Sequence, residues 1–155
     1  MREALKEAAL AGAAGEIPVG AVAVYNGQVI ARGHNQKETD RDPTAHAEIL
    51  VIREAARVLG RWRLTGVTLY CTLEPCPMCA GAMVQARLSE LVYATEDPKT
   101  GAAGSVIDFL RDSRLNHRVE VRTKVLCTEA QRVMEEFFVD LREGRVPRLS
   151  CRPLT

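Results

Sequence analysis

The spacing of apolar positions predicts two helices in the first sixty residues. Residues 2–14 consist mostly of strong helix formers, and Gly15 follows them as a typical helix stop. The apolar stripe of this segment runs through Leu5, Ala9 and Ala13. A longer helical pattern opens at Asp42-Pro43-Thr44, with Thr44 as the predicted N-cap, and ends at Gly60. Both segments are therefore expected to be helical.

Apolar runs of strand length predict a sheet that begins with a hairpin. Residues 18–25 and 29–32 flank Asn26-Gly27, the strongest short signal for a two-residue hairpin turn. Two further apolar runs of strand length cover residues 67–72 and 91–94. The first two strands are therefore expected to pair in the antiparallel sense.

The second half of the chain alternates strands with helices. We expect a helix that ends near Arg87, a loop over residues 97–105, a last strand over 118–121 and a closing helix over 129–142. Strands that alternate with helices usually pair in parallel through crossover connections. The pattern therefore predicts an α/β fold, a mixed sheet with helices on both faces, without internal repeats or linkers.

Length and composition indicate a single domain. A chain of 155 residues with 46% hydrophobic residues is long enough for one core, so residues 1–155 are expected to form one unit. No apolar run approaches the roughly 20 residues that span a bilayer, and residues 1–15 carry too many charges for a secretory signal. We therefore expect a cytoplasmic protein with no membrane partner. Five cysteines, an odd number, argue against a disulfide framework.

The charge balance neither indicates nor excludes a nucleic-acid partner. The formal net charge is +1, far from the strongly basic composition that by itself predicts nucleic-acid binding. Near the C-terminus four arginines are closely spaced: Arg142, Arg145, Arg148 and Arg152. Such a cluster can contact phosphates, but spaced charges more often form a solvated face, and we favour that interpretation.

Cys76 and Cys79 form the first motif with chemical meaning. The two-residue gap lets both sulfurs face one metal ion or each other. A C-x-x-C that follows a strand and opens a helix is also where redox-active dithiols occur, and the helix N-terminus lowers thiol pKa in either case. This spacing alone leaves a metal site and a redox site equally open.

His46 decides between these alternatives in favour of a metal. It lies in the predicted first turn of the preceding helix, so two helix N-termini can converge at one edge of the sheet. One histidine and two cysteines supply three ligands and leave the fourth position of a tetrahedral zinc for water. That arrangement is typical of a catalytic zinc site.

Glu48 follows His46 by two residues and suits a catalytic role better than a capping role. With Thr44 as N-cap, the capping-box position is Ala47, so Glu48 misses that position by one residue. A water that attacks must lose a proton and a leaving amine must gain one, which calls for a carboxylate beside the metal that is not a ligand. We predict that Glu48 is this proton shuttle.

The remaining histidines and cysteines do not extend the metal motif. His34 ends a predicted strand without a ligand at regular spacing, and we exclude it as a ligand. Cys71 lies inside an apolar strand, where a free cysteine behaves as a small hydrophobe. The others have no partner that the sequence identifies: His117, Cys127 and Cys151.

H-x-E at residues 46–48 and P-C-x-x-C at residues 75–79 together resemble the signature of the cytidine deaminase-like zinc deaminases. The resemblance implies a three-layer αβα sandwich with a central five-stranded mixed sheet. It also implies one Zn²⁺ per subunit, held by His46, Cys76 and Cys79. In such enzymes zinc-bound hydroxide attacks the amino-bearing carbon of the base. Glu48 would then act as general acid and base, and ammonia would leave.

Five stretches of the chain resemble the bacterial tRNA adenosine deaminases within that superfamily. They are residues 18–21, 42–49, 72–76, 79–83 and 99–105. The loop over residues 97–105 and the closing helix with its two phenylalanines are more specific than the shared zinc motif. The resemblance implies a homodimer that converts adenosine to inosine at the wobble position of a tRNA anticodon stem-loop, with an arginine tRNA as the implied substrate.

The same resemblance implies a set of substrate-binding residues. Asn35 would hydrogen-bond the purine ring, and the backbone of Ala47 would help to place the base. Four more would shape the pocket for flanking nucleotides: Asp97, Lys99, Phe137 and Phe138. Without the resemblance, Asn35 also suits an ordinary loop, and a phenylalanine pair on a closing helix also suits a core.

Two other functions compete with deamination of tRNA. A deaminase of a free base or nucleoside, such as guanine or cytosine, would use the same zinc motif and the same Glu48. A structural zinc module or RNA-binding domain would need a fourth protein ligand, and the sequence offers no good one. We therefore favour an enzyme over a structural zinc module.

Overall fold

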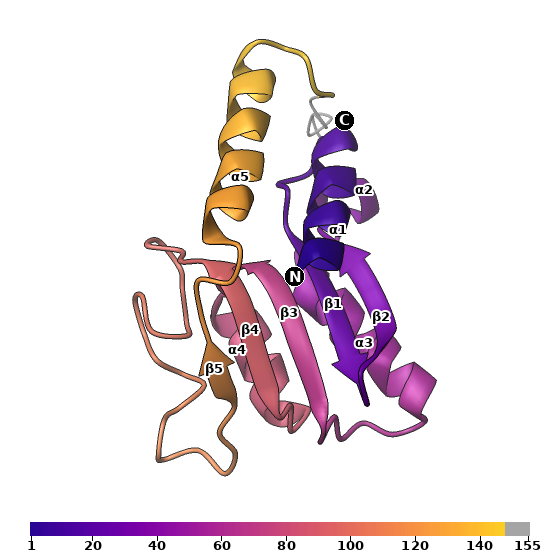
Figure 1. Ribbon diagram of the computed structural model, residues 1–155, viewed down its shortest axis with the longest axis vertical. Coiled ribbons are helices and arrows are strands. Elements are labelled where there is room, and N and C mark those ends of the chain that lie inside the picture. The colour runs from indigo at the N-terminus through magenta and orange to yellow at the C-terminus, as the bar shows by residue number, and fades with distance from the viewer. Residues whose placement is uncertain (148–155) are drawn as a thin grey trace, which may run out of the picture.

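The structure is a computed structural model, and it describes residues 1–147 (Figure 1). Its helices and strands in chain order are α1 (Arg2–Ala13), β1 (Gly20–Tyr25), β2 (Gln28–His34), α2 (Lys37–Asp40), α3 (Ala47–Leu59), β3 (Val67–Leu73), α4 (Pro77–Gln85), β4 (Glu90–Thr95), β5 (Glu120–Arg122) and α5 (Cys127–Arg142). Apart from the short α2, these are the elements expected from the sequence. No helix within residues 1–147 combines the length and apolar character needed to cross a membrane.

The strands form one five-stranded mixed sheet in the order β2-β1-β3-β4-β5. Strand β1 pairs antiparallel with both β2 and β3, whereas β3, β4 and β5 run parallel. Gly20 pairs with His34, and Leu73 pairs with Thr95. One edge of the sheet therefore gathers the start of β1 with the ends of β2, β3 and β4.

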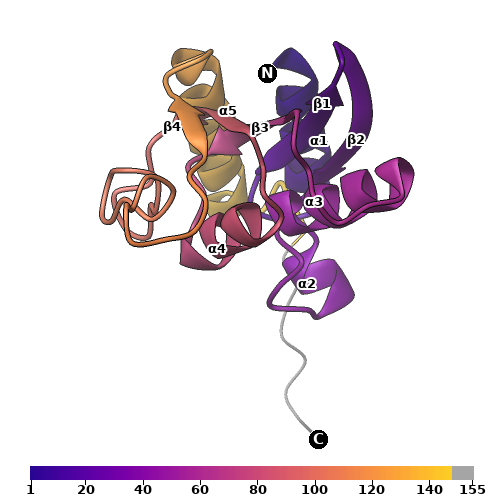
Figure 2. The ribbon, with the colours of Figure 1, turned by 90° about the horizontal axis from the view of Figure 1, so that it is seen from below.

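Helices cover both faces of the sheet, which confirms the three-layer architecture. Helices α1 and α5 lie on one face and contact each other, while α3 and α4 lie on the opposite face (Figures 1 and 2). The core between the layers is formed by side chains of the sheet, such as Val67, Leu69 and Leu91, together with apolar residues of the helices, such as Val51 and Met83. Such a two-sided core explains why the central strand β3 is apolar over most of its length.

The hairpin between β1 and β2 has the turn that its sequence predicts. Asn26 and Gly27 both adopt positive φ angles, 49° and 75°. Two consecutive residues at positive φ form the turn whose twist matches that of the flanking strands, and Asn-Gly is the favoured pair for it. The predicted antiparallel pairing of these strands is confirmed.

The stripe predicted for the first helix is wrong. Ala9 and Ala13 are exposed, and α1 instead buries Ala4, Ala8 and Ala11. A Cβ added to Gly20 would lie 2.1 Å from the backbone oxygen of Ala4. Because the helix backbone approaches β1 so closely, its buried face consists of alanines, and the larger Leu5 and Leu10 lie outside this face.

The predicted start of the second long helix is also wrong. The N-cap of α3 is His46, not Thr44, and residues 37–40 form the additional helix α2. Asp42 accepts hydrogen bonds from the backbone nitrogen and the hydroxyl of Thr44, at 2.8 and 2.7 Å, which closes an Asx turn ahead of the helix. The turn delays the helix until Ala47.

Candidate metal centre

The N-termini of two helices meet where β1 begins and β2, β3 and β4 end, as the sequence predicts. His46 and Cys76 are the N-cap residues of α3 and α4, and both have extended backbone angles. Cys79 lies in the first turn of α4, two residues after Pro77. Proline is well suited to the first helical position because its missing N–H has no helical partner there. The two N-caps and the first turn of α4 thereby bring three ligand side chains together.

The ligand atoms have the spacing that zinc requires. The Nδ1 atom of His46 lies 3.7 Å from Cys76 Sγ and 3.6 Å from Cys79 Sγ, and the two sulfurs are 3.7 Å apart. A tetrahedral zinc with Zn–S of about 2.3 Å and Zn–N of about 2.0–2.1 Å has N···S and S···S edges of about 3.6 and 3.8 Å. The three atoms therefore fit three corners of a zinc tetrahedron.

The sulfurs of Cys76 and Cys79 are 3.7 Å apart, close enough to share one proton. The pKa of Cys76 is lowered to about 4, mainly by the hydrogen bond of Cys76 with Cys79 and then by its hydrogen bond with His46. The same contact with Cys76, together with burial, raises the pKa of Cys79, and the hydrogen bond with Cys76 raises the pKa of His46. One thiolate is thus formed at the N-terminus of α4, where the helix dipole favours negative charge.

Glu48 is buried beside this group. Only 3% of Glu48 is exposed, and burial raises the pKa of its carboxyl to about 7. Its carboxylate does not belong to the set of ligand atoms that lie within 4.8 Å of one another. With His46 as N-cap, the capping-box position is Ile49, so Glu48 again misses it. A carboxyl with a pKa near neutrality suits transfer of protons in both directions.

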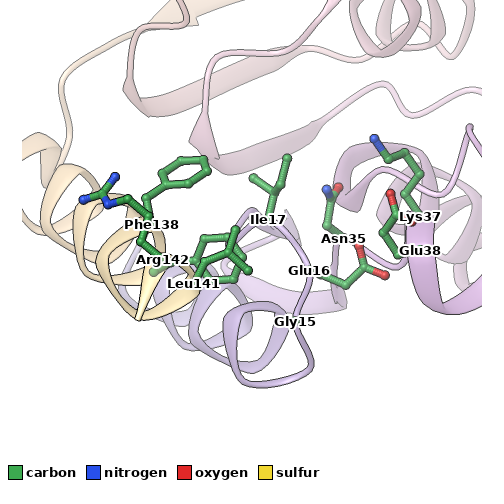
Figure 3. Close-up of a pocket in the computed structure, with 10 residues that line it drawn as sticks. Gly15, Glu16, Ile17, Asn35, Lys37, Glu38, Phe138, Leu141 and Arg142 are labelled. Carbon is green, nitrogen blue, oxygen red and sulfur yellow. The ribbon is translucent and has the colours of Figure 1, made fainter. Parts of the chain in front are cut away.

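Asn35 links Ala47, the residue after His46, to a neighbouring cavity. Its side-chain oxygen accepts a hydrogen bond from the backbone nitrogen of Ala47 at 3.3 Å, and only 7% of Asn35 is exposed. The cavity has a volume of about 470 Å³ and opens between the α2 region and α5 (Figure 3). Its lining consists of Gly15, Glu16, Ile17, Asn35, Lys37, Glu38, Phe137, Phe138, Leu141 and Arg142.

The two phenylalanines of α5 occupy different environments. Their rings contact edge to face with centroids 5.4 Å apart. Phe137 is 6% exposed and belongs to the core, whereas Phe138 is 41% exposed. Figure 3 shows Phe138 and Arg142 on one side of the cavity and Asn35 and Lys37 on the other. Both rings line the cavity, but Phe138 has far more exposed surface with which to contact a ligand.

Asp97 and Lys99 lie on a different segment, the loop that follows β4. The carboxylate of Asp97 accepts hydrogen bonds from the backbone nitrogen of Lys99 at 2.9 Å and from the hydroxyl of Thr100 at 2.6 Å. Neither Asp97 nor Lys99 lines the 470 Å³ cavity. The substrate-binding residues implied by the resemblance thus form two groups, one at the cavity with Asn35 and one on this loop.

None of the other histidines and cysteines among residues 1–147 belongs to the group of His46, Cys76 and Cys79. His34 contacts Glu7 through Nδ1 at 2.8 Å, and His117 donates from Nε2 to the backbone oxygen of Leu88 at 2.6 Å. Cys71 is buried in β3, and burial raises the pKa of its thiol. Cys127 is half-buried in the first turn of α5, and Cys151 lies outside the described residues.

The C-terminal arginines do not form one cluster in the described part of the chain. Arg142 lines the cavity, whereas Arg145 forms ion pairs with Asp140 and Glu143. The other two predicted members of this cluster, Arg148 and Arg152, lie outside the described residues.

Comparison with known proteins identifies the family. A family model described as MafB19-like deaminase matches residues 1–142. The tRNA-specific adenosine deaminase of Bacillus subtilis (strain 168) is 51% identical over 145 residues, which cover 94% of this chain and 90% of that protein. The chain belongs to the family of tRNA-specific adenosine deaminases.

Solved structures of deaminases agree with this assignment. One, from a study of A-to-I editing by tRNA:A34 deaminases at the wobble position of transfer RNA, is 45% identical with a TM-score of 0.83. The match covers 86% of this chain and 96% of that chain. A guanine deaminase from Bacillus subtilis is 44% identical with a TM-score of 0.58, but covers 61% of each chain. The resemblance inferred from the motifs is confirmed, and the His–Cys–Cys group of this deaminase suits zinc.

Two buried carboxylates of this deaminase were missed in the sequence. Glu16 is 2% exposed, accepts a hydrogen bond from the backbone nitrogen of Thr39 at 2.7 Å, and lines the cavity. Glu74 is 1% exposed and lies between β3 and Cys76. The available signal for Glu74 was a charged residue placed directly between an apolar strand and a metal motif. For Glu16, the sequence around it gave no comparable signal.

Proposed function

We propose that this protein deaminates adenosine to inosine at the wobble position of a tRNA anticodon, as a cytoplasmic homodimer with one zinc ion per subunit. The observation that carries the proposal is the 51% identity to a tRNA-specific adenosine deaminase over 94% of the chain. The metal centre and Glu48 support the reaction type, and the exposed ring of Phe138 supports a substrate that extends beyond one base.

His46, Cys76 and Cys79 are the proposed zinc ligands. Their three ligand atoms match three corners of a tetrahedron, which leaves one corner open to solvent or substrate. When bound there, zinc would supply a Lewis acid that lowers the pKa of a coordinated water. Three protein ligands with an open position are the donor set of a catalytic site rather than of a structural one.

Glu48 is the proposed proton shuttle. In the net reaction, water adds to the amino-bearing carbon of adenine, the bond from that carbon to the amine breaks, and ammonia leaves. The carboxylate of Glu48 would accept one proton from the attacking water and deliver it to the ring nitrogen. It would then accept the second proton from the hydroxyl now on the carbon and deliver it to the amine. Its burial and its pKa near 7 allow it to hold and release a proton at neutral pH.

Substrate binding is assigned to residues at the cavity and on the loop after β4. Asn35 and the backbone of Ala47 are proposed to orient the purine, because their mutual hydrogen bond fixes both of them beside His46 and Glu48. Phe138 would stack on a neighbouring base, with the buried Phe137 supporting it. Asp97 and Lys99 would contact the RNA from the loop after β4.

The competing function is deamination of free guanine, which is favoured by the 44% identity to a guanine deaminase over 61% of the chain. An assay on synthetic RNA separates the two. We expect the zinc-loaded protein to convert the first anticodon adenosine of an arginine tRNA stem-loop to inosine, and to leave an adenosine at any other loop position unchanged. Conversion of free guanine or cytosine without conversion of the stem-loop would overturn the proposal.

A further inference from the structure

Glu74 is a buried carboxylate that the proposed chemistry does not use. It lies directly after β3 and two residues before Cys76, and only 1% of it is exposed. Among the ion pairs formed by residues 1–147, none involves Glu74. A buried charge without a counter-ion needs several hydrogen-bond donors to offset its desolvation. The source of those donors indicates what the side chain holds in place.

Within residues 1–147, all the hydrogen-bond donors to the Glu74 carboxylate come from the loop after β4. Its Oε1 accepts hydrogen bonds from the backbone nitrogens of Ala103 and Ser105, at 2.9 and 3.0 Å. Its Oε2 accepts from the backbone nitrogen of Asp97 at 3.0 Å and from the hydroxyl of Ser105. The carboxylate therefore contacts both ends of the segment 97–105.

Backbone contacts continue the same attachment toward the metal ligands. The backbone nitrogen of Glu74 donates to Thr95 at 2.8 Å, and that of Ala102 donates to the oxygen of Pro75 at 2.8 Å. Pro75 immediately precedes Cys76. The loop is thus fixed against the residues that lead into the metal centre.

Gly101 shows how closely the loop approaches the carboxylate. A Cβ at this position would lie 2.3 Å from Oε2 of Glu74 and 2.6 Å from the backbone oxygen of Asp97. Neither contact is possible for a side chain, so the loop can close over Glu74 only with glycine here. The nitrogen of Gly101 also donates to the oxygen of Asp97 at 2.9 Å, which completes the turn around the carboxylate.

We infer that Glu74 is a positioning residue, which holds the loop 97–105 in register with the metal ligands and so places Asp97 and Lys99 for the RNA substrate. The role in substrate binding rests on the proposed function. The role in ordering the loop does not, because it follows from the contacts of Glu74 alone. One side chain thereby links the loop 97–105 to the metal centre.

Amide hydrogen exchange of the zinc-loaded protein tests the ordering role directly. In Glu74→Ala, we expect the amides of Asp97, Ala103 and Ser105 to exchange about ten- to a hundredfold faster, because each loses a charged acceptor. Glu74→Gln keeps one acceptor oxygen. We expect the remaining oxygen to accept from the amides of Ala103 and Ser105, because these two share one carboxylate oxygen in the wild type. Only the amide of Asp97 should then lose protection. Unchanged protection of all three amides in Glu74→Ala would overturn the inference.

Steady-state kinetics on the anticodon stem-loop test the consequence for substrate. For Glu74→Gln we expect zinc content to stay at the wild-type level, KM to rise about tenfold and kcat to change less, because a loosened loop weakens binding before chemistry. Glu90→Gln is the matched control, since Glu90 also accepts from Thr68 and Arg122 but lies at the opposite end of the sheet. Loss of zinc with an unchanged loop would instead assign Glu74 to the metal centre.

Two further variants approach the same contact from the loop. Gly101→Ala pushes the loop off the carboxylate and should reproduce the raised KM and the faster exchange at Asp97, and Ser105→Ala should give a weaker form of both. If Gly101→Ala leaves loop exchange and KM unchanged, the inference fails. If the loop amides lose protection but no variant or wild-type protein deaminates the stem-loop, the proposed function fails while the ordering role of Glu74 stands.

Discussion

The side-chain oxygen of Asn35 accepts a hydrogen bond from the backbone nitrogen of Ala47, 3.3 Å away. This contact joins the residue after β2 to the first residue of α3, which stands between His46 and Glu48. Because the amide oxygen is used in this way, the amide NH₂ of Asn35 is available to the cavity that Asn35 lines. One side chain thus braces the helix of a proposed metal ligand and presents a donor to a substrate.

Replacing Asn35 separates these two roles. Asn35→Asp keeps an acceptor for the N–H of Ala47 but removes the donor, so we expect wild-type zinc content and a kcat/KM that is about ten- to a hundredfold lower. Asn35→Ala leaves that buried N–H without its acceptor and should also cost about 1–3 kcal/mol of unfolding free energy. Stem-loop kinetics and denaturant titration measure the two effects, and an Asn35→Asp enzyme with wild-type kcat/KM would rule out the donor role.

Glu48 is expected to be essential for turnover but not for the metal. Glu48→Ala should retain zinc and lower kcat by about 10²–10⁴, the usual contribution of a general acid–base group. Metal analysis and single-turnover deamination are the measurements. Glu54→Ala, on the exposed face of the same helix, is the control and should behave as wild type. Loss of zinc from Glu48→Ala would reassign Glu48 as a ligand.

Two buried cysteines provide a matched test of the metal ligands. Cys79→Ser should lose zinc, because it replaces one of the three sulfur and nitrogen donors that lie within 4.8 Å of one another. Cys71→Ala should keep zinc and activity, and should lose only about 1 kcal/mol of unfolding free energy from a small cavity in β3. Zinc per subunit, determined by elemental analysis, distinguishes the two variants. Equal zinc content would show that Cys79 is not a ligand.

Zinc affinity is expected to decrease as the pH is lowered. In the zinc-free protein, the hydrogen bond with Cys76 raises the pKa of both His46 and Cys79, whereas the pKa of Cys76 is lowered to about 4, chiefly by Cys79. A group with a raised pKa holds its proton below that pKa, and zinc must displace it.

Below the pKa of His46, binding should therefore release about two protons, one from His46 and one from Cys79. Affinity should then fall about 100-fold for each pH unit by which the pH is lowered. Above it, release of about one proton should give a tenfold change. Competition with a chelator at several pH values measures this slope. An affinity independent of pH would contradict the shared-proton arrangement.

The sequence predicted most of the fold because local signals and tertiary packing agreed over most elements. Asn26-Gly27 determined the hairpin, and Gly60 ended α3 where expected, with a positive φ of 62°. The stripe of α1 was missed because close approach to Gly20, a tertiary contact, selects alanines over leucines. The late start of α3 reflects the Asx turn at Asp42, which competed with a helix cap of similar sequence.

The metal centre was predictable for a different reason. Its members lie in short motifs, and the helix N-termini that carry them had signals of their own, such as Pro77 after Cys76. Glu74 was not predictable in this way, because its partners lie 23 to 31 residues further along the chain and become neighbours only through the parallel pairing of β3 with β4. The division between Phe137 and Phe138 depended on the rotation of α5.

The different exposure of Phe137 and Phe138 gives a last prediction. Phe137→Ala removes a core ring that is 6% exposed and should cost about 3–5 kcal/mol of unfolding free energy. Phe138→Ala removes a ring that is 41% exposed and lines the cavity, so it should leave stability nearly unchanged and weaken stem-loop binding by about 1–3 kcal/mol, the contribution of one stacked base. Phe138→Tyr, which keeps the ring, is the control and should bind as wild type. If Phe138→Ala binds the stem-loop as tightly as wild type, the exposed ring does not stack on a base, and the cavity beside Asn35 has another occupant.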